Sequence, residues 1–346
     1  MSSALGFEVN DISMYGADKI LVNDNSGNNM VWYWQDFGLK LAGEAKERHV
    51  NLLCAGDNLI HQNLYNYDID GLYSDIKPYV ENADIAAVCQ ETVIAANGME
   101  LTDFPRFAVK NDVAKALKNA GFDVFAVSNN HILDKGMEGI DSTYNALADD
   151  EHIVCGINPS EKYSDDLRKS VRFKTIDHVR IAFLSYTYGT NGMPMPEGYK
   201  YAAEKLENEA RIIQQIRYAK ARADAVIVFA HWGTEYDSQL DELQQKMGDL
   251  FVEEKVDVVI GSHPHVLQKF DSFKDKSGHE TVIFYSLGNF VSGQDGEARQ
   301  TGGIADVDIA VDKAGKLSID GYKLIKTKMV RNEQDAGVHL YTEENN

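Results

Sequence analysis

Cysteine is scarce in this chain, with three residues among 346, at positions 54, 89 and 155. Three thiols do not make a disulfide framework, so the sequence leaves the redox compartment open. Cys54 and Cys89 fall in predicted core strands, where a free cysteine packs as a small hydrophobic residue. We therefore assign these two thiols to the core rather than to covalent cross-links.

Positive charge is also in short supply. Lysine and arginine number 34 against 54 aspartates and glutamates, which gives a formal net charge of −20. This balance disfavours nucleic acid and an anionic membrane surface as electrostatic partners, so we expect no nucleic-acid partner. A polyanionic substrate would need a local cationic centre, which a bound metal ion can provide.

Long apolar runs are missing as well. No stretch approaches the roughly 18 apolar residues of a membrane span. The N-terminus lacks the basic-then-apolar pattern of a secretory signal, so the residues themselves assign no location. The hydrophobic fraction of 44% is ordinary for a globular protein and supplies a core. The length fits one large domain or two small ones.

From residue 51 onward, short apolar runs alternate with helical patterns. The predicted strands cover residues 51–55, 85–90, 124–128, 179–185, 225–230, 256–260, 281–286, 304–311 and 317–325. The predicted helices cover residues 39–48, 70–82, 111–120, 139–149, 204–223 and 241–254. Strand–helix alternation closed by two antiparallel strands predicts an α/β fold with mixed sheets.

The stretch 256–266 is the one around which the chemistry is organised. A β-branched run ends in Gly261, and two histidines follow at a spacing of two, His263 and His265. We expect Gly261 to let the chain turn sharply as it leaves the sheet, and Pro264 to stiffen the loop between the two rings. Both imidazoles would then lie at the carboxyl end of a strand, where open α/β sheets place their ligand crevices.

Other polar residues follow predicted strands in the same way. The full set is Asp57, Glu91, Asn130, His131, His231, His263 and His265. Imidazole nitrogen and carboxylate oxygen suit zinc, manganese or iron. Two metal ions about 3.5–4 Å apart form the arrangement that supports in-line attack on phosphorus. A histidine left unligated could protonate a leaving oxygen.

Each member of the set also has a simpler interpretation. Asp57 after Gly56 could cap a turn, and Glu91 could be a solvated strand end. Asn130 suits a turn, and His231 could be a core histidine bonded to a backbone carbonyl. Because every member falls within a few residues of a strand's carboxyl end, we favour a metal site over these separate explanations.

Six motifs in a fixed order carry a family resemblance. They are Gly56-Asp57, residues 129–131 with Asp134 and Gly136, residues 186–192, residues 231–236, residues 261–266 with Gln268, and residues 285–290. Over about residues 50–295 this set resembles the bacterial capsule-biosynthesis family of CapA-type (poly-γ-glutamate synthesis) proteins. That family is similar in fold to the calcineurin-like metallophosphatases.

The resemblance implies a four-layer α-β-β-α sandwich with two mixed sheets, metallophosphatase-like in fold. It implies an N-terminal extension over 1–48, the family domain over 49–300, and C-terminal strands and a tail over 301–346 that complete the same domain. The implied metal ligands are Asp57, Asn130, His231, His263 and His265, with Glu91 in the bridging position. His131 would be the general acid, oriented by Asp134. Glu235 and Asn289 would support the ligands or face the substrate. From the residues themselves, Tyr186 and Asn191 of the loop 186–192 could line the substrate, or the segment could simply be a tight loop. Arg299 could bind an anionic substrate through two hydrogen bonds, or it could be solvated on a polar loop. By contrast, Trp232 is expected to pack in the core.

Two positions depart from the family and fold patterns. Cys89 stands where the family usually has asparagine, two residues before Glu91. Leu59 stands where ordinary metallophosphatases have the histidine of Asp-x-His, and His61 follows two residues later as a further candidate. We therefore expect one or two divalent transition-metal ions, manganese, zinc or iron.

Three functions are compatible with these residues. The first is a metal-dependent hydrolase that acts on phosphoester or phosphodiester bonds. The second is a non-hydrolytic component of capsule synthesis that binds, exports or anchors an anionic polymer. The third is a non-catalytic scaffold that retains the fold. The resemblance implies an anionic polymer or phosphoester as ligand, membrane components of capsule synthesis as partners, and a cell-surface or extracytoplasmic location.

Overall fold

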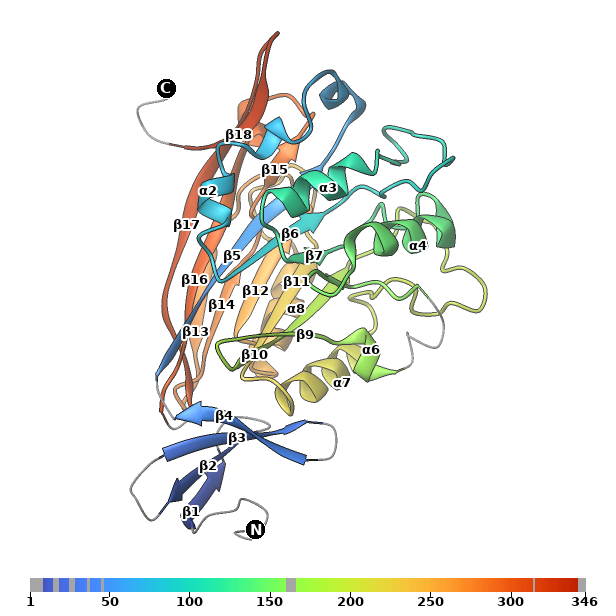
Figure 1. Ribbon diagram of the computed structural model, residues 1–346. Coiled ribbons are helices and arrows are strands. Elements are labelled where there is room, and N and C mark those ends of the chain that lie inside the picture. The colour runs from blue at the N-terminus through green and yellow to red at the C-terminus, as the bar shows by residue number, and fades with distance from the viewer. Residues whose placement is uncertain are drawn as a thin grey trace.

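The structure is a computed structural model (Figure 1). It describes residues 9–14, 19–24, 29–35, 38–44, 47–159, 166–313 and 315–341. Two mixed sheets form its body, and a small antiparallel sheet precedes them in the chain.

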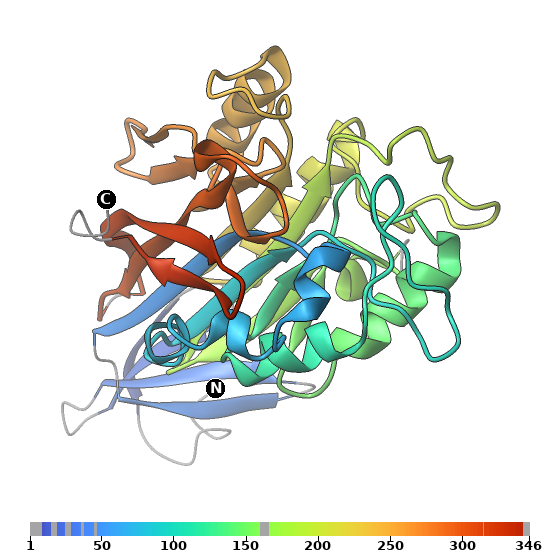
Figure 2. The same cartoon turned by 90° about the horizontal axis from the view of Figure 1, so that it is seen from above.

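The larger sheet has the strand order β18-β17-β16-β5-β6-β7-β8. Its parallel strands are β5 (Arg48–Leu59), β6 (Ile85–Gln90), β7 (Val124–Ala126) and β8 (Ile153–Cys155). Its antiparallel strands are β16 (Thr301–Val311), β17 (Leu317–Arg331) and β18 (Ala336–Leu340). Figure 2 shows these late strands, in orange and red, beside the blue β5. The division into residues 1–48, 49–300 and 301–346 stays a prediction.

The smaller sheet has the order β13-β14-β12-β11-β10-β9. Its inner, parallel strands are β10 (Val179–Thr187), β11 (Ala225–His231), β12 (Val258–Ser262) and β14 (Glu280–Phe284). Antiparallel edge strands flank them, β9 (Arg172–Ile176) and β13 (Phe270–Lys274). The polar, partly exposed edge strands lack a clear apolar pattern, which is why the sequence did not predict them.

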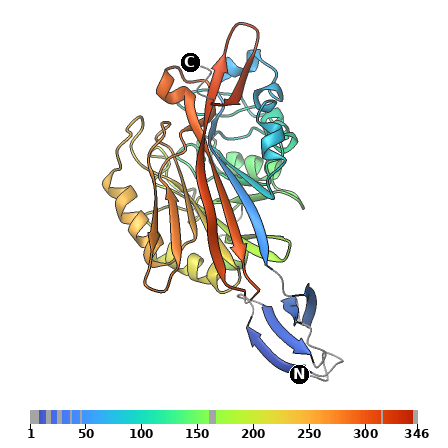
Figure 3. The same cartoon turned by 90° about the vertical axis from the view of Figure 1, so that its left-hand side faces the viewer.

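The two sheets pack face to face and helices cover both outer faces. The shared apolar layer joins Leu52 and Ile85 of the larger sheet to Phe183 and Ile227 of the smaller one. The covering helices are α3 (Asp112–Asn119) and α4 (Gly136–Leu147) on one side, and α7 (Glu209–Lys220) and α8 (Glu242–Glu253) on the other. Figure 3 shows helices on opposite flanks of the strands. The predicted four-layer sandwich is confirmed.

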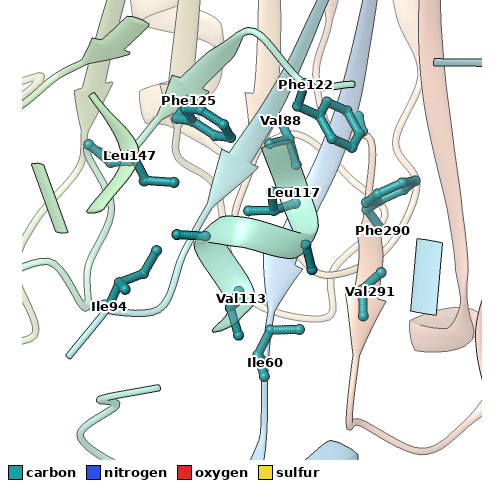
Figure 4. Close-up of a cluster of buried hydrophobic side chains, with 14 of the residues drawn as sticks. Ile60, Val88, Ile94, Val113, Leu117, Phe122, Phe125, Leu147, Phe290 and Val291 are labelled. Carbon is teal, nitrogen blue, oxygen red and sulfur yellow. The ribbon is translucent and has the colours of Figure 1, made fainter. Parts of the chain in front are cut away.

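The apolar cluster between the larger sheet and its covering helices shows how α3 is held against the sheet. Val113 and Leu117 of α3 lie in one buried cluster with Val88 of β6 and Phe290 (Figure 4). Phe290 belongs to β15 (Asn289–Ser292), which pairs with the end of β5. The apolar positions of α3 recur at helical spacing, so one stripe of the helix faces the sheet.

Short helical turns complete the list of elements. They are η1 (Gln62–Asn66), η2 (Gly71–Tyr73), α2 (Lys77–Val80), α6 (Leu167–Ser170) and α9 (Glu297–Gln300). Among the described residues, no helix combines the length and the apolar character needed to cross a membrane.

Three predicted helices were wrong in whole or in part. Of the predicted helix 39–48, residues 39–44 and 47–48 are not helical, and residues 45–46 lie outside the described residues. Residues 39–44 belong to the separate N-terminal sheet, which is formed by β1 (Val9–Met14), β2 (Lys19–Asp24), β3 (Asn29–Gln35) and β4 (Gly38–Glu44). Leu39 and Leu41 alternate with a polar residue between glycines, which favours a strand. Residues 70–82 form only η2 and α2, because Pro78 interrupts a longer helix. Residues 204–208 are a loop, and α7 begins at Glu209.

A buried ion pair holds that loop against α7. Glu204 accepts hydrogen bonds from Arg211 Nε at 2.7 Å and from Arg211 Nη2 at 2.6 Å. Both side chains are nearly inaccessible to water. The Glu204 carbonyl accepts from the Thr187 amide and the Ser128 hydroxyl, which lie at the ends of β10 and β7. The pair therefore fixes the point at which two strands leave the sheets.

Replacing Arg211 with alanine should lower the free energy of unfolding by about 3–5 kcal/mol, because it leaves the Glu204 charge buried without its partner. Urea denaturation at pH 7 measures the loss. Arg217 is the matched control, since it pairs with Glu254 while its own side chain is 68% exposed. Arg217→Ala should cost below about 1 kcal/mol. Equal losses in the two variants would contradict the assignment.

A second buried carboxyl group, that of Asp257, makes stability depend on pH. Asp257 lies just before β12 and accepts a hydrogen bond from the Val226 amide at 2.7 Å. Burial raises its pKa to about 7, against the opposing effects of the Val226 bond and the Lys220 charge. The His279 ring, whose own pKa is lowered by burial, lies 3.8 Å away.

Because the folded-state pKa of Asp257 is raised, the folded protein holds a proton that the unfolded chain has lost. Stability from this group is complete below about pH 4 and falls by about 1.4 kcal/mol per pH unit up to pH 7. Asp257→Asn removes this slope. The difference in unfolding free energy, variant minus wild type, should therefore increase from pH 5 to pH 8 in urea titrations. A difference that does not change with pH would count against the raised pKa.

Candidate metal centre

The carboxyl ends of the two sheets converge on one buried group of potential metal ligands. Asp57 lies near the end of β5, Glu91 follows β6, His231 ends β11, and His263 and His265 follow β12. All five are at most 3% exposed. Donor atoms of Glu91, His231 and His263 lie within 4.8 Å of one another, as do those of Asp57, Glu91 and His265. The two groups share Glu91, the residue expected in the bridging position.

A change of strand partner places Asp57 at the centre. The first part of β5 pairs with β16, and its last residues pair with β15 instead. Asn289 of β15 is the register partner of Asp57 on one side, and Cys89 of β6 is its partner on the other. The Asp57 amide donates to the Gly288 carbonyl at 2.9 Å. Backbone pairing therefore holds Asp57 from both sides.

Side-chain hydrogen bonds orient two of the histidines. His231 Nδ1 contacts the Ser262 hydroxyl at 2.9 Å, and His265 Nδ1 contacts Asn289 Oδ1 at 3.0 Å. The Nε2 atoms of both rings lie 3.8 Å from Glu91 Oε1. Hydrogen bonds of this kind fix the rings of metal-binding histidines in other proteins. The second nitrogen of each ring is thereby directed at the carboxylate.

Four acceptor or donor atoms in the centre have no hydrogen-bond partner within the described part of the chain. They are Asp57 Oδ1, both oxygens of Glu91, and His263 Nδ1. Burial raises the pKa of both carboxyl groups, and the Asp57 charge raises that of Glu91 further. Burial also lowers the pKa of His263 and His265 to about 3. Every group is therefore driven towards its neutral form, and the site lacks a positive charge.

These residues fit a divalent metal ion. Buried polar atoms in proteins are almost always paired, and buried charges are paired or coordinate metals. A cation among Asp57, Glu91 and His263 would satisfy the unpaired atoms and oppose the two carboxylate charges. The donors are nitrogen and oxygen, which suits transition metals.

The turn into the histidine loop is not made where the sequence predicted it. Gly261 lies inside β12, and a Cβ there would be 1.9 Å from the Tyr285 carbonyl oxygen. Glycine is required at 261 by this close approach and not by a turn. His263 and His265 take the left-handed conformations instead, with φ of 97° and 58°. Such φ values are uncommon for residues other than glycine.

Beside the carboxylate cluster lies a second histidine–carboxylate pair. His131 Nδ1 contacts Asp134 Oδ2 at 2.8 Å, as the expected role of Asp134 requires. The same oxygen accepts from the Phe107 amide at 2.7 Å, and the Phe107 ring packs edge-on against the His131 ring at 4.7 Å. Phe107 was not predicted from the sequence, because it lies in a loop outside the other motifs and no pattern marks it.

The loop after β10 carries Tyr188 and Asn191, which contact His263 and Asn130 of the centre. Asn130 Oδ1 lies 2.8 Å from His231 Nε2, and Asn130 Nδ2 donates to Asn191 Oδ1 at 3.3 Å. Asn191 is exposed and has a φ of 48°. The Tyr188 ring lies 4.5 Å from the His263 ring. The structure thus brings Asn130 and Asn191 to the centre as expected.

Tyr186 does not face the site, so its prediction as a substrate contact was wrong. It is still within β10, on the face that the helices cover. Its hydroxyl donates to Gln215 Oε1 at 2.9 Å, and its ring stacks on Phe251. Tyr188 lies at the site instead, because the chain leaves the strand after Thr187.

Of the remaining expected substrate contacts, Glu235 and Arg299 lie at the rim, and Asn289 is fully buried. Glu235 is exposed, and its carboxylate belongs to a group with His263 and His265. Asn289 contacts His265, and the Arg299 guanidinium lies 5.2 Å from the centre of the Tyr236 ring. The role of each as a substrate contact stays a prediction. Trp232 packs in the core with its indole N–H on the Tyr285 carbonyl, which confirms the packing role.

Cys89 and Leu59, the two residues that depart from the expected pattern, are both buried. Cys89 is buried between the sheets, and all three cysteines are free. Leu59 is buried at the end of β5. His61 Nδ1 lies 3.0 Å from the Leu59 carbonyl oxygen, and its ring packs edge-on against Phe107. His61 belongs to none of the candidate metal-binding groups found among the described residues.

Comparison with known proteins gives the chain its relatives. A family model described as bacterial capsule synthesis protein PGA_cap matches residues 51–294. The capsule biosynthesis protein CapA of Bacillus anthracis is 30% identical over 238 residues, 66% of this chain and 55% of that protein. The PGA biosynthesis protein CapA of Bacillus subtilis is 29% identical over 233 residues, 65% of this chain and 57% of that protein. The match thus spans little more than half of either relative.

Solved structures show weaker likeness. The NAD nucleotidase NadN of Haemophilus influenzae has a TM-score of 0.49 at 14% identity, covering 86% of this chain and 61% of that one. A 5'-nucleotidase described as putative from Staphylococcus aureus has a TM-score of 0.48 at 13% identity, covering 80% and 54%. Neither likeness supports an inference about activity. The family model, in contrast, matches well over half of the chain, and the chain belongs to the bacterial capsule synthesis PGA_cap family.

Proposed function

We propose that this protein is a metal-dependent hydrolase of phosphoester or phosphodiester bonds that acts in the synthesis of an anionic capsule polymer. One observation carries the proposal. A buried cluster with unpaired carboxylate oxygens, centred on Glu91, lies next to a histidine–carboxylate pair, His131 and Asp134, at the meeting edge of two sheets. The first supplies the ligands for a cation, and the second supplies a proton donor.

The proposed ligands are the six residues predicted from the sequence. They are Asp57, Glu91, Asn130, His231, His263 and His265, with Glu91 shared between two overlapping groups. A bound divalent ion would polarise a phosphoryl oxygen and offset the negative charge of the transition state. The candidate metals are manganese, zinc and iron, with one or two ions per chain. Ser262 and Asn289 hold the ligand rings in orientation.

His131 is the proposed general acid. Asp134 holds its Nδ1, which leaves Nε2 to donate a proton to the leaving oxygen. Phe107 supports the pair twice, through its amide on Asp134 and its ring on His131. Asn191 borders the same space, with its Nδ2 3.5 Å from His131 Nδ1. The proton donor is thereby held in one position rather than free to rotate.

The capsule context comes from the relatives, whose printed names concern capsule and PGA biosynthesis. We infer an anionic polymer or a phosphoester precursor as ligand, membrane components of capsule synthesis as partners, and a cell-surface or extracytoplasmic location. The net charge of −20 disfavours nucleic acid as partner.

The second candidate is a component that binds or anchors the polymer without hydrolysis. Leu59, in the position where ordinary metallophosphatases carry a histidine, favours it, because the substitution removes one potential ligand. A binding role needs neither the proton donor nor a full set of ligands. The two candidates therefore differ in what His131 does, and the second prediction below separates them.

Mn²⁺ or Zn²⁺ should raise the thermal stability of the chelator-treated protein, by about 2.7 kcal/mol at 100 times the dissociation constant. Glu91→Gln should lose most of this gain, because one ligand shared by two groups is removed. Its metal-free form should be at least as stable as the wild type, since the glutamine amide removes a buried ionisable group whose oxygens lack hydrogen bonds. Thermal unfolding with and without EDTA measures the metal-dependent gain and the stability of the metal-free variant. Elemental analysis should find one or two metal ions per chain.

The matched control is an exposed cluster of the same residue types, Glu47, His49 and Asp320. His49→Ala should keep the full metal-dependent gain. If His49→Ala and Glu91→Gln lose the gain equally, or if no divalent metal stabilises the wild type, the assignment of the metal centre is wrong.

His131→Gln should slow hydrolysis of a phosphodiester with an alkyl leaving group by about 10²–10⁴-fold, because that leaving oxygen needs a proton. A 4-nitrophenyl ester, whose leaving group is stable as an anion, should be slowed much less. Phe107→Leu, which keeps the backbone amide but loses the ring, should show a smaller loss with the same preference. Steady-state kinetics on metal-loaded protein gives the ratio of the two rates.

Phe122→Leu is the control for packing, because Phe122 is equally buried in the core beneath α3. It should change both rates together and leave their ratio unaltered. Metal content should be normal in all variants. Wild-type protein that binds metal but hydrolyses neither ester would favour the binding role over the hydrolase.

A further inference from the structure

Arg299 is a half-buried arginine at the rim of the centre that has no ion-pair partner among the described residues. Acidic residues near it in sequence do not neutralise it. Asp295 pairs with Arg331 instead, and Glu297 is exposed. In a chain of net charge −20, an arginine without a carboxylate partner is available for an external anion.

The arginine is held in place by contacts that begin at the metal centre. Asn289, which contacts His265, donates from Nδ2 to Gln294 Oε1 at 3.1 Å and to the Arg299 carbonyl at 2.9 Å. Gln294 Nε2 donates to the Tyr236 hydroxyl at 3.3 Å. The Tyr236 ring lies 5.8 Å from the His265 ring and 5.2 Å from the guanidinium carbon. The guanidinium is therefore positioned relative to His265.

The backbone leaves room for this position of the guanidinium. Gly296 has a φ of 105°, and a Cβ there would lie 3.3 Å from Arg299 Nη2. A side chain at 296 would therefore press on the guanidinium. Tyr236 is 50% exposed, so the surface made by Tyr236 and Arg299 opens to solvent.

We propose that Tyr236 and Arg299 form a platform that binds a second oxyanion of the substrate, a carboxylate or a phosphate, beside the group held at the metal centre. The guanidinium can donate two parallel hydrogen bonds to an oxyanion, and the Tyr236 ring beside it restricts the motion of the guanidinium. This inference rests on the proposed function and narrows it. The substrate class becomes a phosphoester that carries a further anionic group close to the reacting phosphorus.

The test compares metal-loaded wild type with Arg299→Gln and Arg299→Lys. Two substrates share a 4-nitrophenyl phosphodiester, and one of them carries a carboxylate on the other alcohol. Arg299→Gln should reduce the preference in kcat/KM for the carboxylate substrate by roughly 10-fold, mainly through KM. Arg299→Lys should recover only part of it, because an ammonium cannot bind bidentately.

A binding measurement makes the inference independent of turnover. Calorimetric titration of the metal-loaded protein with γ-linked triglutamate and with inorganic phosphate reports affinity for carboxylate and phosphate separately. Arg299→Gln should weaken the affinity for at least one of the two probes by roughly 10-fold. The probe whose affinity falls identifies whether the platform binds a carboxylate or a phosphate. Because a metal ion alone also attracts both probes, only the loss caused by the Arg299 substitution counts.

Arg222 is the matched control. Its guanidinium stacks on the Tyr218 ring in the same way, at 3.8 Å, but it follows α7 near the start of β11, at the opposite end of that strand from His231. Arg222→Gln should keep the substrate preference and both affinities.

The outcomes separate the two proposals. If wild type hydrolyses neither ester but Arg299→Gln weakens anion binding, the hydrolase proposal fails and the platform stands. If hydrolysis occurs and Arg299→Gln behaves like Arg222→Gln in preference and in both titrations, the platform is overturned and the hydrolase stands.

Discussion

Two buried carboxyl groups that no cation among the described residues compensates, where the two sheets meet, are the constraint on which the site depends. Asp57 and Glu91 are out of contact with water, and three of their four carboxylate oxygens lack a hydrogen bond. The metal-binding role proposed for the cluster rests on this constraint, because a cation would stabilise the ionised carboxylates and would itself be held in a fixed position. The neighbouring imidazoles are neutral when buried, so they offer lone pairs and not competing charge.

Several features around the cluster serve to keep it assembled. The exchange of β16 for β15 along β5 sets Asn289 beside Asp57, and Asn289 in turn orients His265. Gly261 lets the Tyr285 carbonyl approach β12 more closely than any side chain would allow. The Glu204–Arg211 pair anchors the loop that follows the end of β10. These features fix the positions of backbone segments, and the backbone in turn sets where the ligand side chains lie.

The order of strands and helices, and the gathering of ligands at one edge, could be predicted because both depend on local pattern. Carboxyl ends of parallel strands meet at one edge, so Asp57, Glu91 and His231 were predicted together from their places after apolar runs. What failed depends on contacts distant in sequence. Tyr186 and Tyr188 are indistinguishable in the sequence, and only the point where β10 ends separates a core residue from a site residue.

Phe107 and Gly261 are two further residues whose contacts could not be predicted from the sequence pattern. The Phe107 amide donates to Asp134 and the Phe107 ring packs edge-on against His131, and neither contact leaves a periodic signal in the chain. Gly261 was recognised as special, but for a turn that His263 and His265 in fact make. A sequence pattern reports that a residue is constrained, and the packing partner, here the Tyr285 carbonyl, decides why.

Charge distribution bears on the choice between hydrolysis and polymer binding. A protein that holds a long polyanion along its surface needs an extended run of cationic groups, and this chain has 20 more acidic than basic residues. Near the centre, the exposed Glu235 would repel an anionic chain, while Arg299 can attract one anionic group. In the proposed function, attraction near the centre comes from a bound metal ion and from Arg299. Such a local contact would suit recognition of one reacting phosphoester and its nearest anionic neighbour, which is the contact that the proposed hydrolysis requires.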